Sequence, residues 1–149
     1  MITYITGDIF KQEVEALVNP VNCVGVMGKG LALQFKEKFF DNYCLYKKAC
    51  ERDKVAIGSM FVTQTYYLTP PYFIINFPTK KHWRALSKLE YIEEGLYDLV
   101  KAIDYYSIKS IAIPPLGCGL GGLNWEDVKA LIDKILVTVD CEITVLRPQ

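Results

Sequence analysis

Apolar positions along the chain follow two periods. Short β-branched or continuous apolar runs predict strands, at residues 2–6, 16–21, 60–64, 72–77, 110–113 and 143–146. Apolar residues three and four positions apart predict helices, at about residues 30–39, 42–52, 89–103 and 125–135. Ser87 and Glu90 have the spacing of a capping box for the third helix, and Asn124 is the expected cap of the fourth. Because strands and helices alternate, the pattern predicts an α/β fold with helices on both faces of a mixed sheet.

Two glycine-rich loops interrupt this pattern, each between a strand and a helix. The first follows Asn22 and contains Gly25, Gly28 and Gly30; the second contains Gly117, Gly119, Gly121 and Gly122. Glycine lets backbone N–H groups turn inward, and a helix N-terminus adds a positive dipole end, so each loop is a candidate anion site. If the two strands are neighbours in a parallel sheet, the loops lie side by side and suit a diphosphate. For one loop alone, an ordinary turn is an equally good interpretation.

Two nucleotide-binding motifs match these loops in part. Residues 117–122 match the dinucleotide fingerprint literally, but Pro114 and Pro115 precede them and only one strand follows, which argues against a Rossmann half. In the first loop Gly30 follows Lys29, where a Walker loop needs Ser or Thr to bind magnesium. Neither a dinucleotide-binding half nor a triphosphate-hydrolysing loop is therefore favoured.

Composition narrows the class of protein. The 149 residues include 51% hydrophobic and 23% charged residues and carry no net charge, so we expect one soluble globular domain over residues 1–149 without a general nucleic-acid coat. Five cysteines, odd in number and without a C-x-x-C pair, indicate reduced thiols in a cytoplasm. Cys23 and Cys118 lie in the glycine loops, where small apolar filler is the favoured role. No signal peptide or membrane span is predicted.

Polar residues at strand ends are the next candidates. Asp8 follows the first strand and is either a cap or turn residue or an acceptor for the amine of an adenine. Asn22 either satisfies the backbone of its own loop or faces a ligand, since ligands bind at the carboxyl ends of strands in open α/β sheets.

A basic segment, defined here as residues 79–88, leaves the strand at residues 72–77. It contains Thr79, Lys80, Lys81, His82, Trp83, Arg84 and Lys88. A solvated basic loop is the ordinary interpretation. However, the segment also holds the only histidine and a tryptophan that no helical pattern buries. Crowded cations lower one another's pKa, so one of these lysines would be partly neutral and nucleophilic toward a carbonyl carbon.

Five motifs in order give the chain a family resemblance. They are Gly7-Asp8-Ile9, Asn19-Pro-Val-Asn22, residues 25–35, Asn76-Phe-Pro-Thr-Lys-Lys-His-Trp-Arg84 and residues 114–125. Together they resemble macrodomains, and more narrowly DarG-type antitoxin macrodomains, which are relatives of the animal terminal ADP-ribose protein glycohydrolase. The resemblance spans the whole chain and implies a three-layer α/β/α sandwich with a central mixed, mostly parallel six-stranded sheet.

The resemblance also implies an ADP-ribose cleft. Asp8 would bind the adenine amine and Ile9 would line that end, while Val21, Asn22 and Thr79 would lie along the cleft. The phosphates and distal ribose would contact two sets of loop residues, namely Gly28, Lys29, Gly30 and Leu31 in the first loop and Gly117, Cys118, Gly119, Leu120 and Gly121 in the second. Lys80 matches the catalytic lysine of this subgroup, and Asn22 would orient the distal ribose or the attacked centre. At Gly121 the animal enzyme has an acidic catalytic residue, so the general acid/base is unassigned.

The implied activity is removal of ADP-ribose from thymidine bases of single-stranded DNA, which reverses the modification made by a DarT-type toxin. Such an enzyme would need no cofactor and no metal and would act as a monomer. His82, Trp83 and Arg84 would contact the DNA, with Trp83 stacking on a base. Two alternatives remain open: a non-catalytic ADP-ribose-binding module, and a glycohydrolase that acts on ADP-ribosylated protein carboxylates.

Overall fold

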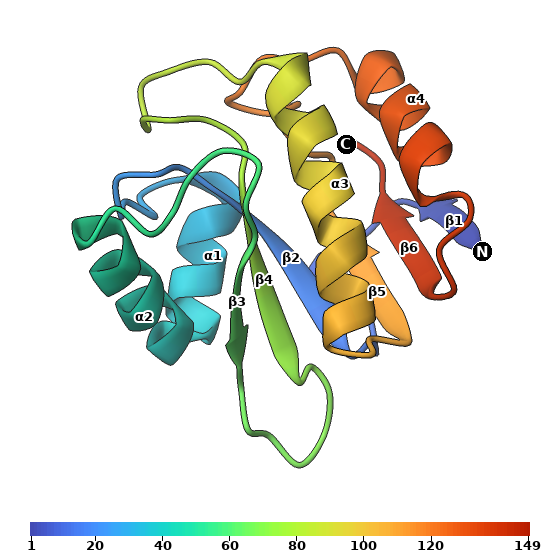
Figure 1. Ribbon diagram of the computed structural model, residues 1–149, viewed down its shortest axis with the longest axis horizontal. Helices are drawn as coiled ribbons and strands as arrows, with labels where there is room; N and C mark the ends of the chain where they lie inside the picture. Colours follow the sequence, from blue (N-terminus) through green and yellow to red (C-terminus); the bar gives the residue numbers. More distant parts are fainter.

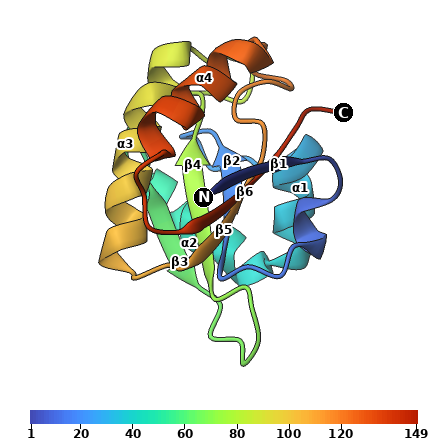
Figure 2. The same cartoon turned by 90° about the vertical axis from the view of Figure 1, so that its right-hand side faces the viewer.

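The structure is a computed structural model that describes residues 1–149 and has three layers (Figures 1 and 2). Its strands are β1 (Ile2–Ile5), β2 (Ala16–Val21), β3 (Phe61–Gln64), β4 (Phe73–Pro78), β5 (Ser110–Ile113) and β6 (Glu142–Leu146). Its helices are the short 3-10 helix η1 (Ile9–Lys11) and the α-helices α1 (Gly30–Lys38), α2 (Phe40–Glu51), α3 (Leu89–Tyr105) and α4 (Trp125–Leu136). The predicted elements are confirmed, with boundaries that differ by one or two residues.

The six strands form one sheet in the order β1-β6-β5-β2-β4-β3. Only the β3–β4 pair is antiparallel; the other four pairs are parallel. The α/β/α sandwich around a mixed, mostly parallel sheet is therefore confirmed. Because β2 lies between β5 and β4, the two glycine loops and the basic segment all leave the same edge of the sheet.

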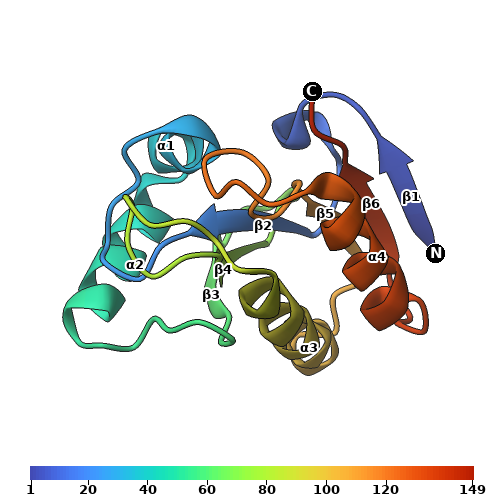
Figure 3. The same cartoon turned by 90° about the horizontal axis from the view of Figure 1, so that it is seen from above.

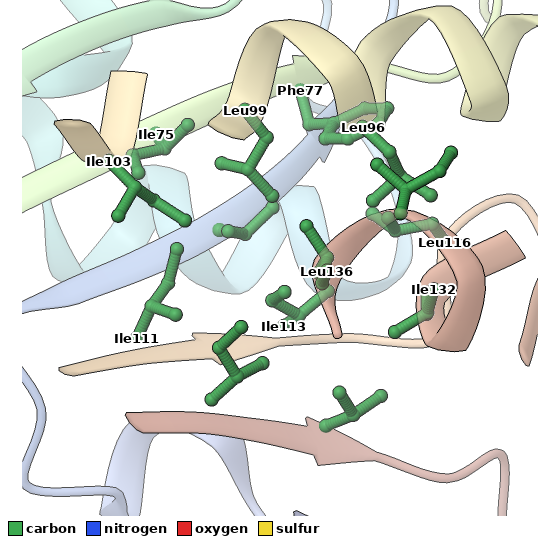
Figure 4. Close-up of a cluster of buried hydrophobic side chains, with 14 of the residues drawn as sticks. Ile75, Phe77, Leu96, Leu99, Ile103, Ile111, Ile113, Leu116, Ile132 and Leu136 are labelled. Atoms are coloured by element: carbon green, nitrogen blue, oxygen red, sulfur yellow. The ribbon is translucent and has the colours of Figure 1, made fainter. Parts of the chain in front are cut away.

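Each face of the sheet is covered by helices, as Figure 3 shows from above. Helices α3 and α4 pack on the face that carries Ile75, Ile111 and Ile113, and this cluster is the larger part of the core (Figure 4). Helix α1 packs on the opposite face through Phe35, against Leu17 and Ile74. Strands β2 and β4 are buried on both faces, which is why their sequences are almost continuously apolar.

Helix α3 approaches β4 closely because Gly95 faces Phe77. A Cβ at position 95 would overlap the Phe77 ring, so only glycine fits here. Since Phe77 is near the carboxyl end of β4, this contact also fixes the point at which the basic segment begins.

A buried polar network lies between the sheet and α2. The Asn19 amide donates to Asn76 Oδ1 (3.1 Å), and Asn76 and Asn42 exchange two hydrogen bonds (2.8 and 3.1 Å). Thr63 on β3 donates to Asn42 (2.7 Å), and Asn76 also donates to the Phe61 carbonyl (2.9 Å). The network thus joins β2, β4, β3 and α2 in the interior.

The capping-box prediction for α3 is wrong. The helix begins at Leu89 and its cap residue is Lys88, which makes no side-chain hydrogen bond to the helix. Ser87 lies one residue earlier, in a buried position. By contrast, Asn124 caps α4 as predicted, since its Oδ1 accepts from the backbone N–H groups of Glu126 (2.9 Å) and Asp127 (3.3 Å).

None of the helices combines the length and the apolar composition that crossing a lipid bilayer requires. All five cysteines are free thiols.

Candidate functional site

A cavity of about 470 Å³ lies at the carboxyl ends of β2, β4 and β5. Its wall comes from the two glycine loops and the basic segment, which gather at one end of the sheet (Figures 1 and 3). The lining residues are Pro20, Val21, Asn22, Val26, Gly28, Lys29, Gly30, Leu31, Ala32, Thr79, Lys80, Trp83, Pro114, Pro115, Gly117, Gly119, Leu120 and Gly121. Both the volume and the position are typical of a small-molecule site in an open α/β sheet.

Asn22 holds the first glycine loop in place. Its Oδ1 accepts from the backbone N–H groups of Val24 (3.1 Å) and Val26 (3.4 Å), and its Nδ2 donates to the Val26 carbonyl (2.8 Å). The buried Tyr46 hydroxyl on α2 lies 2.8 Å from the same Oδ1. Of the two roles expected for Asn22, the structure shows the loop-bracing one. One of its two amide hydrogens remains for a ligand.

Burial raises the pKa of Tyr46 well above its usual range, so its hydroxyl stays protonated and available as a donor. No sequence pattern predicts this contact, because Tyr46 lies in a helix 24 residues away from Asn22.

The first loop ends at the N-terminus of α1. No side chain caps this helix, so the backbone N–H groups of its first turn have no side-chain acceptor. Gly30 has a φ of +57°, a conformation that favours glycine. Lys29, Gly30 and Leu31 all line the cavity, so an anion there would meet free donors and the positive end of the helix dipole.

The second glycine loop is held by backbone hydrogen bonds. The N–H of Leu123 donates to the Gly117 carbonyl (2.9 Å), that of Gly122 to the Gly119 carbonyl (3.2 Å), and that of Ser87 to the Gly121 carbonyl (3.0 Å). The helix that follows this loop has fewer free backbone donors for an anion, because the Asn124 side chain already accepts from the first N–H groups of α4. Of the two loops, only the first therefore ends on a helix N-terminus without a side-chain cap.

Lys80 reaches the cavity from the start of the basic segment. Its Nζ donates to the Trp83 carbonyl at 3.0 Å. Burial lowers the pKa of Lys80, in the predicted direction but not by the predicted cause, since desolvation and not the neighbouring cations accounts for the shift. A lowered pKa increases the fraction of neutral amine, which is the nucleophilic form.

The rest of the basic segment forms an aromatic and cationic rim. Trp83 lines the cavity and is 42% exposed; it stacks with His82 at 5.3 Å between ring centroids, and the Arg84 guanidinium lies 4.4 Å from its ring centroid. Lys81 and Lys88 each lie 5.8 Å from the ring centroid of Tyr91. Tyr91 was not predicted as part of the site, and its only sequence signal is a position three residues after Lys88 on α3.

Five predicted site residues lie outside the cavity wall: Asp8, Ile9, Cys118, His82 and Arg84. The Asp8 carboxylate accepts from the Phe10 N–H (2.9 Å) and caps η1, which is the cap role expected for it. Ile9 is buried in the core. Burial raises the pKa of the Cys118 thiol to about 11, so the thiol is neutral at physiological pH, as expected of apolar filler.

Five lining residues were not predicted: Pro20, Val26, Ala32, Pro114 and Pro115. All five lie within or next to the predicted motifs, so the motifs identified the right segments but not every residue that faces the cavity.

Fold and site together define a three-layer α/β/α protein with one cleft built from two glycine loops and a lysine-bearing segment. The Macro domain family model matches residues 18–132, and the chain belongs to this family.

Two relatives and two solved structures show the narrower similarity. The chain is 60% identical over 129 residues to a DNA ADP-ribosyl glycohydrolase of Mycobacterium tuberculosis, covering 87% of this chain and 37% of that protein. It is 32% identical over 149 residues to the human ADP-ribose glycohydrolase OARD1, covering 97% of this chain and 90% of that protein. The macrodomain of Mycobacterium tuberculosis DarG superposes with a TM-score of 0.98 at 53% identity, covering 100% and 99% of the two chains. Thermosipho africanus DarTG in complex with ADP-ribose superposes with a TM-score of 0.91 at 34% identity, covering 99% of this chain and 41% of that one.

The resemblance to DarG-type macrodomains and, more distantly, to the animal glycohydrolase is thus confirmed. The chain spans about two fifths of the length of the Mycobacterium tuberculosis glycohydrolase that it matches.

Proposed function

We propose that the chain is a hydrolase that removes ADP-ribose from thymidine bases of single-stranded DNA, reversing the modification made by a DarT-type toxin. The observation that carries the proposal is the position of Lys80, which lines the cavity between the two glycine loops and has a lowered pKa. The 60% identity to a DNA ADP-ribosyl glycohydrolase supports DNA as the substrate class. The partners are the modified DNA strand and the toxin that modifies it.

The diphosphate of ADP-ribose would lie between the two loops, where the free N–H groups at the start of α1 face the cavity. The adenine end would extend beyond the cavity toward Asp8, whose carboxylate keeps one oxygen free after capping η1. The distal ribose would then lie near Lys80 and Asn22. Since the oxygen of the Asn22 amide already has its donors, Asn22 would orient the ribose through its remaining N–H and not act as a base.

Lys80 would act at the distal anomeric carbon, which gains oxocarbenium character as the thymine leaves. In one mechanism the neutral amine attacks this carbon, or its ring-opened aldehyde form, and water later hydrolyses the lysyl intermediate. In the other, Lys80 only positions the substrate or the water. Both mechanisms need Lys80, and both leave the general acid unassigned.

The rim would bind the DNA strand. Trp83 is exposed enough to stack on a base beside the modified thymidine, and Arg84, whose guanidinium lies 4.4 Å from the Trp83 ring centroid, would contact a phosphate of the strand. Tyr91, whose ring lies near Lys81 and Lys88, offers a second aromatic surface for a neighbouring nucleotide.

The test measures free ADP-ribose released from a single-stranded oligonucleotide that carries ADP-ribosyl thymidine. We expect Lys80→Ala to lose about 10²-fold or more in rate while retaining ADP-ribose affinity by calorimetry. Lys101→Ala, which replaces an exposed lysine on α3, is the control and should retain the wild-type rate. In the mechanism in which Lys80 attacks the anomeric carbon, the neutral amine is the reactive form, so the rate should rise with pH through a midpoint below the usual lysine pKa.

Two outcomes would change the assignment. If the wild type binds ADP-ribose but releases none, the chain is a binding module, which the two loops alone would support. If a peptide with an ADP-ribosylated carboxylate is hydrolysed faster than the oligonucleotide, the protein-linked activity is the better assignment; the similarity to OARD1 is the reason to include that substrate. Trp83→Ala distinguishes the DNA-linked from the protein-linked activity, since it should slow the release of ADP-ribose from the oligonucleotide and not from the peptide.

A further inference from the structure

Ser87 is an exception to the hydrogen-bonding pattern of the core. The side chain is 7% exposed, and its hydroxyl is buried without any hydrogen-bond partner. A buried, unpaired hydroxyl is destabilising, so a native structure that keeps one calls for an explanation. A helix-capping role is excluded, because α3 begins two residues later with Lys88 as its cap.

The position of Ser87 links two parts of the site. It lies near the end of the basic segment, just before Lys88, the cap of α3, and its backbone N–H donates to the Gly121 carbonyl (3.0 Å). The Ser87 hydroxyl is directed at Gly121 from beneath the second loop. A Cβ at position 121 would overlap that hydroxyl oxygen and lie 2.6 Å from the Gly117 carbonyl oxygen.

The hydroxyl, the Gly117 carbonyl and Gly121 therefore converge on one point under the cavity wall. The Gly117 carbonyl accepts one hydrogen bond, from Leu123 (2.9 Å), and a carbonyl oxygen has a second lone pair. The one side-chain hydrogen bond of the second loop is internal, from the Cys118 thiol to the Leu116 carbonyl (3.5 Å), so no side chain from another element holds the loop against a shift that brings the hydroxyl onto this acceptor. A phosphate bound in the cavity would attract the backbone N–H groups of the second loop and so shift the loop.

We propose that Ser87 is a positioning residue whose hydroxyl donates to the Gly117 carbonyl when the diphosphate of ADP-ribose occupies the second glycine loop. The proposal rests on the proposed function, because it takes ADP-ribose as the ligand. The proposal connects ligand binding with the position of the lysine. A bound diphosphate would hold Ser87, near the C-terminal end of the basic segment that carries Lys80.

The experiment compares three variants by thermal unfolding without ligand and by calorimetric titration with ADP-ribose. Ser87→Ala should unfold at the wild-type temperature or higher, because it removes an unpaired buried hydroxyl, and should bind ADP-ribose about fivefold more weakly. Ser87→Thr keeps the hydroxyl and should recover most of the affinity. Ser110→Ala is the matched control, since the Ser110 hydroxyl accepts from the Glu15 N–H (2.9 Å) at the start of β5; it should unfold at a lower temperature with unchanged affinity.

Two results would overturn the proposal: wild-type affinity in Ser87→Ala, or a Ser87→Thr variant as weak as Ser87→Ala. A lowered melting temperature with unchanged affinity would show a merely structural serine. If the wild type binds ADP-ribose but does not hydrolyse the DNA linkage, the hydrolase assignment fails while the Ser87 result still stands. If the wild type binds no ADP-ribose, both fail.

Discussion

The two glycine loops look alike in sequence but are held in different ways. The first is braced by side chains: the Asn22 amide accepts two hydrogen bonds from the loop backbone and donates one to it, and the Tyr46 hydroxyl on α2 donates to Asn22. The second is held by backbone hydrogen bonds and one thiol bond within the loop, from Cys118 to the Leu116 carbonyl, and the Ser87 hydroxyl beneath it has no partner. The first loop is thus preorganised without ligand, whereas beneath the second loop the Ser87 hydroxyl still lacks a hydrogen-bond acceptor.

This difference indicates a division of labour. A preorganised loop contributes affinity because little is lost in ordering it. An adaptable loop can convert ligand binding into a change elsewhere, in this case at the segment that carries Lys80. Three substitutions test the contrast, in order of decreasing effect on stability.

The largest effect is expected from Asn22→Ala. The change leaves the N–H groups of Val24 and Val26 without their acceptor and removes one of the two acceptors of the Tyr46 hydroxyl, which keeps the Asn22 backbone carbonyl. We therefore expect a loss of about 2–4 kcal/mol in the free energy of unfolding. Urea denaturation measures it. Asn124→Ala, which also removes an acceptor for two backbone N–H groups but at an exposed helix cap, should cost only about 1 kcal/mol. Equal losses in both variants would mean that the first loop is no more braced than an ordinary cap.

Gly121→Ala should have an intermediate effect. Its methyl group would overlap the Ser87 hydroxyl and lie 2.6 Å from the Gly117 carbonyl, and such overpacking costs about 1–3 kcal/mol in unfolding free energy. Gly119→Ala is the control in the same loop, since no heavy atom lies within 4 Å of a Cβ added there, and it should leave the unliganded stability unchanged. Similar stabilities for the two variants would show that the loop moves aside without cost and is softer than we describe.

The smallest effect is expected from Tyr46→Phe. Asn22 Oδ1 keeps both backbone donors when the hydroxyl is lost, so the expected cost is about 1 kcal/mol. Tyr105→Phe, at a position 80% exposed, should change nothing measurable. If Tyr46→Phe lowered the stability as much as Asn22→Ala, the tyrosine and not the asparagine would be the principal brace.

The sequence predicted the parts of the site that have local signals. Strand, glycine loop and helix follow one another within a few residues, so both loops, the basic segment and the position of Lys80 could be placed. Tyr46 and Tyr91 could not, because their roles depend on contacts across the fold and a tyrosine in a helical pattern indicates only packing. Ser87 was misassigned because its spacing to Glu90 fits a capping box, while the chain turns into α3 one residue later, at Lys88.

The buried network of Asn19, Asn42, Asn76 and Thr63 has a consequence for accuracy of assembly. In the observed alignment Asn19 is opposite Asn76 and Val21 is opposite Pro78. A slip of β4 by one residue would turn the Asn76 side chain to the apolar face and leave its partners unpaired, and each buried polar group so orphaned costs about 1–3 kcal/mol. The buried amides therefore destabilise folds in which β4 is misaligned with β2. Because Lys80 follows β4 directly, the same buried hydrogen bonds determine where Lys80 enters the cleft.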